Sequence, residues 1–242
     1  MNARVWPSVI LVVVLCCAPG LAQAWESAKE VVHGSARVLE KGETMVGILS
    51  PLGYGVHERV TVFTHPALLL LLTPSIWARL AILEGKAGLS LEGGYQQSWL
   101  YLVTQEGSSA GEDSKTSAPG YAQMGLVYSQ LFTDTIQLNV AGGYLGEFGR
   151  EDREDRFTGL YWRLGAHFLF KEVNLLLAEV RGKVLAGEDL EVPTGSLIFA
   201  RQLGRARLGF GACFGRFGPE QFPEVLDKPL YVYPWVDVWW RF

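Results

Sequence analysis

Long stretches in which apolar side chains occupy every second position constrain the fold of this chain more than any other feature. In the clearest stretch, Leu160, Trp162, Leu164, Ala166 and Phe168 alternate with Tyr161, Arg163, Gly165 and His167. Residues 136–144 and 206–214 repeat the pattern. A helix needs apolar spacings of three and four, whereas a strand has a side-chain period of two. The sequence therefore predicts an all-β protein.

The lengths of these strands and of their connections indicate which kind of β protein to expect. The alternating stretches run for about ten residues or more, the length that a bilayer-spanning strand needs, whereas strands in globular proteins usually have about five or six. Short turns near 132–134, 170–172 and 203–204 are interspersed with long polar loops at 105–119, 147–155, 186–192 and 218–229. A soluble β-sandwich has shorter strands and no such sorting of turns into two lengths. The pattern is typical of a transmembrane antiparallel β-barrel.

The N-terminus has the organisation of a cleavable export signal. Arg4 precedes the apolar run 9–17, and Ala22-Gln23-Ala24 supplies small residues at a cleavage site. The run is too short to span a bilayer as a helix, which needs about 20 apolar residues. Leu15 before Cys16 does not fit a lipoprotein signal. We expect residues 1–24 to be a signal peptide and the exported chain to begin at Trp25.

Composition excludes several other classes of function. Loss of Arg4 with the leader changes the formal net charge from −4 to −5, which is not the basic footprint of a nucleic-acid-binding protein. Cys213 is the one cysteine outside the leader, so it forms no internal disulfide and belongs to no metal-ligand spacing. The sequence contains no glycine-rich phosphate-binding motif of the G-x-x-x-x-G-K type. We expect no metal and no cofactor.

The chain ends in VYPWVDVWWRF, in which hydrophobic residues occupy every second position back from the terminal phenylalanine. These positions are Phe242, Trp240, Val238 and Val236, and Pro234 departs from the pattern. The ending resembles the C-terminal strand of Gram-negative outer-membrane β-barrel proteins. In that family, this strand is the signal read by the barrel-assembly machinery. The resemblance implies an outer-membrane location, with membrane lipid and that machinery as partners.

Counting strands leaves a question of parity, because a barrel with both ends on one side of the membrane needs an even number. We predict eleven strands, at 43–50, 57–64, 76–84, 87–104, 120–131, 135–146, 156–170, 172–185, 193–203, 205–216 and 230–242. The apolar segment 67–73 is the best candidate for a twelfth; if instead one early strand does not span, ten remain. We favour twelve strands within a barrel of residues 43–242. Residues 25–42 precede it as a periplasmic arm, a short helix or a plug.

Alternation also predicts which charged side chains face the lumen. The predicted set is Arg163, Glu179, Arg181, Lys183, Arg205, Arg207, Asp237 and Arg241. One interpretation is structural, since a narrow barrel fills its interior with paired charges. The other is a narrow, anion-favouring path, because six of these eight residues are basic.

Catalytic residues are harder to find. The four histidines are His33, His57, His65 and His167, and Ser50 is the candidate serine near His57 and His65, with no motif around it. We therefore predict no enzyme activity and favour a structural or narrow channel-like role. A lipid-modifying enzyme and a barrel that binds partners through its outer loops remain alternatives. A continuous lumen favours the channel, a serine–histidine pair at the rim favours the enzyme, and a plugged lumen with ordered outer loops favours the interaction barrel. The sequence leaves the oligomeric state open.

Overall fold

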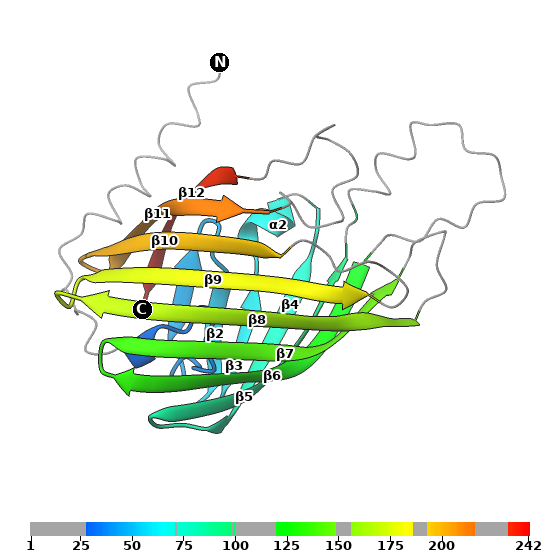
Figure 1. Cartoon of the computed structure of the whole chain (residues 1–242), viewed down its shortest axis with the longest axis horizontal. Coiled ribbons are helices and arrows are strands. Elements are labelled where there is room, and N and C mark those ends of the chain that lie inside the picture. Colours follow the sequence, from blue (N-terminus) through cyan, green and yellow to red (C-terminus); the bar gives the residue numbers. More distant parts are fainter. Residues whose placement is uncertain are drawn as a thin grey trace, which may run out of the picture.

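Twelve antiparallel strands close into a barrel in the computed structural model, which describes residues 28–70, 72–97, 99, 120–148, 156–185, 193–215 and 232–242 (Figure 1). Each strand pairs with its sequence neighbours, and β1 pairs with β12 to close the wall. The strands are β1 (Thr44–Gly47), β2 (Leu52–His57), β3 (Val60–Thr64), β4 (Ser75–Leu83), β5 (Ala87–Gln97), β6 (Gly120–Thr133), β7 (Ile136–Phe148), β8 (Arg156–Phe170), β9 (Asn174–Leu185), β10 (Thr194–Leu203), β11 (Ala206–Phe214) and β12 (Val232–Arg241).

The predicted number of twelve strands is confirmed, but the choice of the twelfth was wrong. The segment 67–73 begins with the short helix α2 (Pro66–Leu70), and Pro66 stands at its first position, where proline favours a helix. The missing strand is β2, whose inward positions are Gly53 and Gly55. Glycines in place of polar partners conceal the alternation from the sequence. No helix in the described ranges is long and apolar enough to cross a membrane.

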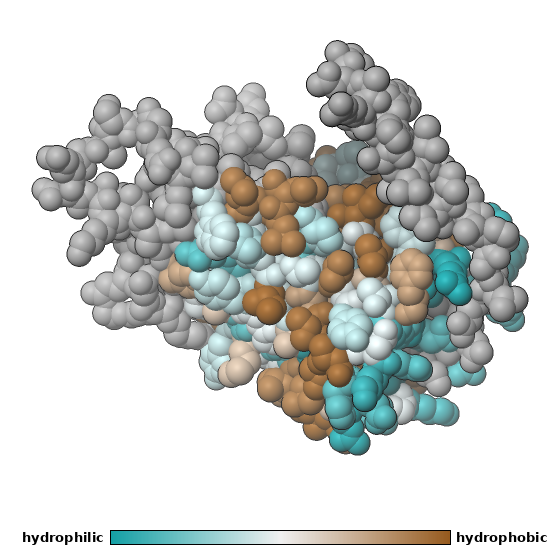
Figure 2. Space-filling view, turned by 180° about the vertical axis from the view of Figure 1, so that it is seen from behind, coloured by the Kyte–Doolittle hydropathy of each residue, from teal (hydrophilic) through white to brown (hydrophobic). Residues whose placement is uncertain are grey.

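Alternation separates an apolar outer wall from an inner wall that is largely polar on β4–β8 and largely apolar on β9, β10 and β12. Large hydrophobic side chains such as Leu126, Val140 and Leu164 are exposed on the outside. Ser90, Ser129 and other polar side chains on the inside are fully buried. Figure 2 shows hydrophobic residues over the outer wall, with hydrophilic ones gathered at one end. An apolar belt above a polar rim is the surface expected of a barrel in a bilayer.

Tight hairpins define one end of the barrel, which we call the short-turn end. The turn between β8 and β9 places both Lys171 and Glu172 at positive φ, 53° and 56°. Gly204 has φ 64° in the two-residue turn between β10 and β11. Short hairpins use such left-handed conformations, because these match the twist of the flanking strands.

Residues 28–42, which we call the luminal segment, lie inside the barrel at the short-turn end. The segment begins with a 3₁₀ turn (Ala28–Glu30). Its backbone donates hydrogen bonds to the inner wall: Ala28 N to Asp134 O, Ala36 N to Ser129 Oγ and Leu39 N to Thr61 Oγ1, each 2.7 Å. Its apolar residues Val31, Val32 and Leu39 belong to a buried cluster with wall residues. Of the three possibilities for residues 25–42, the described part is a plug-like segment within the lumen.

Candidate functional site

The luminal segment reverses direction at a turn whose tip reaches up into the lumen. Ser35 N donates to Val32 O at 3.3 Å, and Gly34 has φ 67°, the conformation that a type II turn requires at its third residue. His33 forms the tip, and its side chain is exposed to the lumen. A β-carbon at Gly34 would lie 3.0 Å from Glu179 Oε2, so the turn fits closely against the wall.

A buried arginine fixes the luminal segment to the wall. Arg79 Nη1 donates to the backbone oxygens of Val32 and Arg37, at 2.9 and 3.0 Å. The other side of the guanidinium pairs with Glu92, with Arg79 Nε 3.0 Å from Glu92 Oε2. Arg79 and Glu92 are 5% and 6% exposed. Such charge-assisted bonds in a buried setting are among the strongest that a side chain makes.

A polar layer on β6, β7 and β8 continues this attachment. Arg37 Nε donates to Gln137 Oε1 at 3.3 Å, and Gln137 Nε2 donates to Asn139 Oδ1 at 3.1 Å. His167 lies against the same two amides, 3.4 and 3.2 Å away. His167 is therefore part of the hydrogen-bonded network that holds the segment.

The charged residues predicted to line the lumen take several different roles. Arg163 lies 3.9 Å from Glu92 and 3.8 Å from Glu179. Arg181 donates to Thr194 Oγ1 at 3.2 Å, and Lys183 stands one inward position further along β9. Arg205 lies in the turn between β10 and β11 and is exposed.

Arg207 and Arg241 lie at the short-turn end. Arg207 is buried, and Arg241 forms hydrogen bonds with Glu30 of the luminal segment and with Glu43, which directly precedes β1. Arg241 Nη1 donates to Glu30 O at 2.8 Å, and Nη2 donates to Glu43 Oε2 at 2.9 Å. Arg241 thus binds the segment, which is a role that alternation alone does not reveal.

Asp237 acts as a clasp on the connection between β1 and β2. Its carboxylate accepts hydrogen bonds from the backbone nitrogens of Ile48, Leu49 and Ser50, at 3.1, 2.8 and 2.7 Å. The side chain is only 2% exposed. Three successive N–H groups converging on one carboxylate form an anion-binding turn, here filled by the chain itself.

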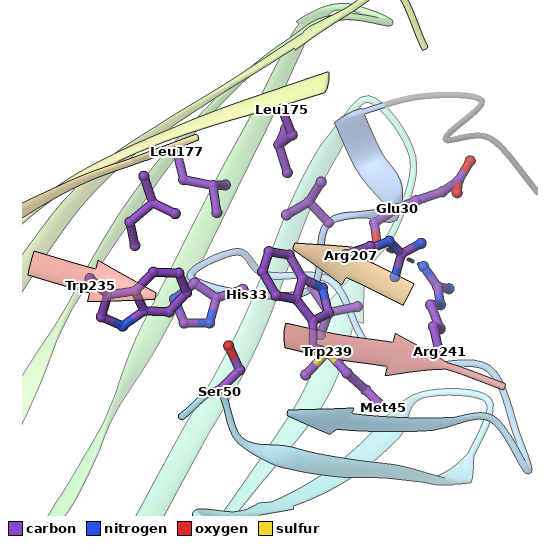
Figure 3. Close-up of a pocket in the computed structure, with 13 residues that line it drawn as sticks. Glu30, His33, Met45, Ser50, Leu175, Leu177, Arg207, Trp235, Trp239 and Arg241 are labelled. Carbon is purple, nitrogen blue, oxygen red and sulfur yellow. Dashed lines mark hydrogen bonds between the residues drawn. The ribbon is translucent and has the colours of Figure 1, made fainter. Parts of the chain in front are cut away.

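A narrow cavity, which we call the luminal cavity, runs between the luminal segment and the inner wall formed by β9–β12 and β1 (Figure 3). It holds about 520 Å³ of space outside protein atoms, part of it open to solvent, but only about 30 Å³ admits the centre of a water molecule. Its walls are mainly apolar, with Val31, Leu177, Ile198, Trp235 and Trp239 among them. Arg207 and Arg241 flank one end, and His33 and Ser50 lie at the other.

Ser50 and His33 line the same cavity, a pairing that the sequence did not suggest. The candidate partners for Ser50 were His57 and His65. His57 is exposed at the β2–β3 turn, where its Nδ1 accepts from Arg59 N at 3.3 Å. Enclosure by the barrel lowers the pKa of His33, Glu179 opposes this, and Arg163, Arg79 and Arg181 add to the lowering. The His33 imidazole is therefore neutral near pH 7.

The residues of the terminal pattern are placed by the closure of the barrel. Val236, Val238 and Trp240 point away from the lumen, because the inward positions of β12 are Trp235, Asp237 and Trp239. The backbone of Phe242 exchanges two hydrogen bonds with Thr44, at 2.9 and 3.0 Å. Pro234 lies in β12 without a break in register, opposite Ala212.

The fold and the site define a class: a closed twelve-stranded antiparallel barrel whose lumen holds its own N-terminal segment beside an apolar cavity. No model of a known protein family matches this sequence, and no curated protein matches it significantly.

Proposed function

We propose that the protein is an integral outer-membrane barrel that binds an amphipathic, acyl-chain-bearing molecule in the luminal cavity. The apolar outer wall supports insertion in a bilayer, and the terminal pattern supports recognition by the barrel-assembly machinery. The single observation that carries the binding proposal is the cavity itself. Its walls are apolar, and a hydrocarbon chain enters it only if the luminal segment shifts, because the free space is narrow. The guanidinium groups of Arg207 and Arg241 lie at one end, where an anionic head competes with Glu43 for Arg241.

The luminal segment weighs against an open channel as the resting function. It occupies the short-turn end of the lumen, and Arg79 and Ser129 hold it there. Arg163 forms ion pairs with Glu92 on β5 and with Glu179 on the neighbouring β9, and this pairing supports the structural interpretation of the inward charges. An anion-favouring path through the barrel requires the luminal segment to move out of the lumen. Conductance measurements test for that open state separately.

A direct test measures binding of a dansyl-labelled medium-chain fatty acid to the protein in lipid nanodiscs. Trp235 and Trp239 line the cavity, so a bound dansyl group receives energy from them. We expect saturable transfer in the unchanged protein and its loss in Ile198→Trp, which fills the cavity. Ser196→Trp is the matched control, because Ser196 is the neighbouring inward position on β10 and lies outside the cavity lining. Equal binding by both variants overturns the proposal.

Acyl-ester hydrolysis is a second candidate, favoured by the placement of Ser50 and His33 at one end of an apolar cavity. A neutral imidazole is the form that accepts a proton from a nucleophilic hydroxyl. Asp237 does not orient His33, because its carboxylate is bound to backbone nitrogens. Covalent labelling by a lipid-like fluorophosphonate that is lost in Ser50→Ala and His33→Ala, but kept in Ser196→Ala, supports hydrolysis. Absence of labelling in the unchanged protein rejects it.

A further inference from the structure

Among the described residues, the ladder that closes the barrel between β12 and β1 is much shorter than the ladder on the other side of β12. β12 pairs with β11 along nine positions, from Ala206↔Trp240 to Phe214↔Val232. Its pairing with β1 covers only three, from Met45↔Arg241 to Gly47↔Trp239. One more bond, Ile48 N to Val238 O at 3.2 Å, ends the contact. Beyond Val238, the described residues provide no strand partner for the β1-facing edge of β12.

The backbone groups along this open edge can be identified from the register. Thr44 pairs with Phe242 by two hydrogen bonds and Ile48 donates to Val238, so even-numbered residues of β12 face β1. The open edge therefore presents the backbone of Val236, Pro234 and Val232. Proline has no N–H to leave unsatisfied, which explains why Pro234 is tolerated without a register shift. An open sheet edge does not face lipid in a bilayer unless something covers it.

The point at which the chain leaves the ladder is fixed by Asp237, which binds the connection after β1 to the inner face of β12. The bonds from Asp237 to the nitrogens of residues 48–50 turn the chain out of the ladder at Ile48. On the outside, the margins of the opening are apolar and exposed: Ile48 is 53%, Val236 58% and Val232 67% exposed. On the inside, Trp235 and Ser50 line the luminal cavity at the same level. The exposed apolar margin on the outside and the apolar lining of the luminal cavity on the inside therefore lie on the two sides of the same stretch of β12.

We propose that the seam beside residues 232–238 of β12, where the pairing with β1 has ended, is a lateral portal. Through it the acyl tail of the bound molecule passes between the luminal cavity and the bilayer. This inference rests on the proposed binding function and adds the route and the source of the ligand. An acyl chain is the occupant that fits both sides, because the outer margin and the cavity walls are apolar and only the far end of the cavity is basic. A hydrocarbon chain forms no hydrogen bonds, so it can cover the open edge of β12 near Pro234, where the backbone has no N–H group to satisfy.

Photolabelling with two lipids tests this route. Protein in nanodiscs is exposed to a free fatty acid or to a phospholipid, each with a diazirine at the end of the acyl chain, and the labelled residues are mapped by mass spectrometry. We expect the phospholipid to label the inward-facing Trp235 and Trp239 as well as outward residues such as Leu164. Ser50→Trp, which fills the inner mouth, removes the inward labels, whereas Ser196→Trp keeps them. Retention of the barrel by both variants is checked from its heat-dependent mobility in gels.

The outcomes separate the portal from the binding function. If the free fatty acid labels the cavity and the phospholipid labels only outward residues, the portal is wrong and binding stands. If neither lipid labels the cavity, both proposals are overturned. A photoreactive benzoylphenylalanine at Val236 adds a second test, with Leu164 as a similarly exposed control on β8. Capture of the chain's own residues at Val236, with capture of lipid at Leu164, shows that the protein closes the seam itself and overturns the portal.

Discussion

At the scale of single residues, Asp237 shows how one side chain sets the shape of the wall. It was predicted as a lumen-lining charge, and its position on the inner face of β12 agrees with that alternation. Its partners, however, are the backbone nitrogens of Ile48, Leu49 and Ser50. The sequence cannot reveal such a role, because the bonded atoms belong to the main chain 187–189 residues away.

Replacing Asp237 tests this clasp. Asp237→Ala leaves three backbone N–H groups without their acceptor, so we expect the free energy of unfolding to fall by about 2–3 kcal/mol. Urea unfolding in lipid vesicles, followed by tryptophan fluorescence, measures the change. Asp237→Asn keeps one acceptor oxygen and should lose less. Equal stability of all three proteins would show that the turn at residues 48–50 holds without the carboxylate.

Gly55 provides a second residue-scale test, because the luminal segment leaves the lumen directly against it. A β-carbon there would lie 1.9 Å from Glu40 O, whereas one at Gly142 would meet nothing closer than 3.4 Å. Since the clash involves backbone rather than a flexible side chain, Gly55→Ala should cost about 2 kcal/mol or more. Gly142→Ala should stay within about 0.5 kcal/mol. The same unfolding measurement compares them, and similar losses would mean that the segment does not pack on Gly55.

At the scale of elements, the luminal segment decides whether the lumen conducts. Arg79→Gln removes the bonds to Val32 O and Arg37 O and leaves Glu92 without its closest partner. We expect the unchanged protein to be silent in planar bilayers, and this variant to open in discrete steps with anion preference, because Arg163, Arg181 and Lys183 remain. A chain lacking residues 28–40 is the positive control, and the outward-facing Arg201→Gln is the matched one. Steady conductance of the unchanged protein would restore the channel hypothesis.

The long strands could be predicted from the sequence, and the short ones could not. From β4 to β8, apolar outward positions alternate mainly with polar or small inward ones, so the period of two is directly visible. β9 to β12 are long enough to show the same period, although inward positions such as Leu177, Ile198 and Trp239 are apolar. β1, β2 and β3 have only four to six residues, and two inward positions of β2 are glycines. Their place in the wall is set by the luminal segment and by Asp237, through contacts distant in sequence. The candidate site was missed for the same reason, since its cavity joins residues from both ends of the chain.

At the scale of the whole molecule, the terminal residue belongs both to the proposed assembly signal and to the closure of the barrel. The closing contact between β1 and β12 is short, with three paired positions and the two Thr44–Phe242 bonds. Phe242 therefore contributes a pair of backbone hydrogen bonds to one of the two short junctions that β1 makes in the wall. The side chain is 60% exposed, so its loss removes little packing inside the barrel.

Two variants separate these contributions. Deleting Phe242 removes both the aromatic side chain and the backbone bonds to Thr44, so we expect less folded protein in the membrane fraction and a lower unfolding midpoint. Phe242→Ala keeps the backbone bonds, so it should lower the amount assembled in cells while the purified protein unfolds within about 0.5 kcal/mol of the unchanged one. Quantitative gels of the membrane fraction and urea unfolding supply the two readouts. If Phe242→Ala assembles normally and only the deletion is impaired, the residue acts through closure alone, and the resemblance of this ending to an assembly signal has no consequence in this protein.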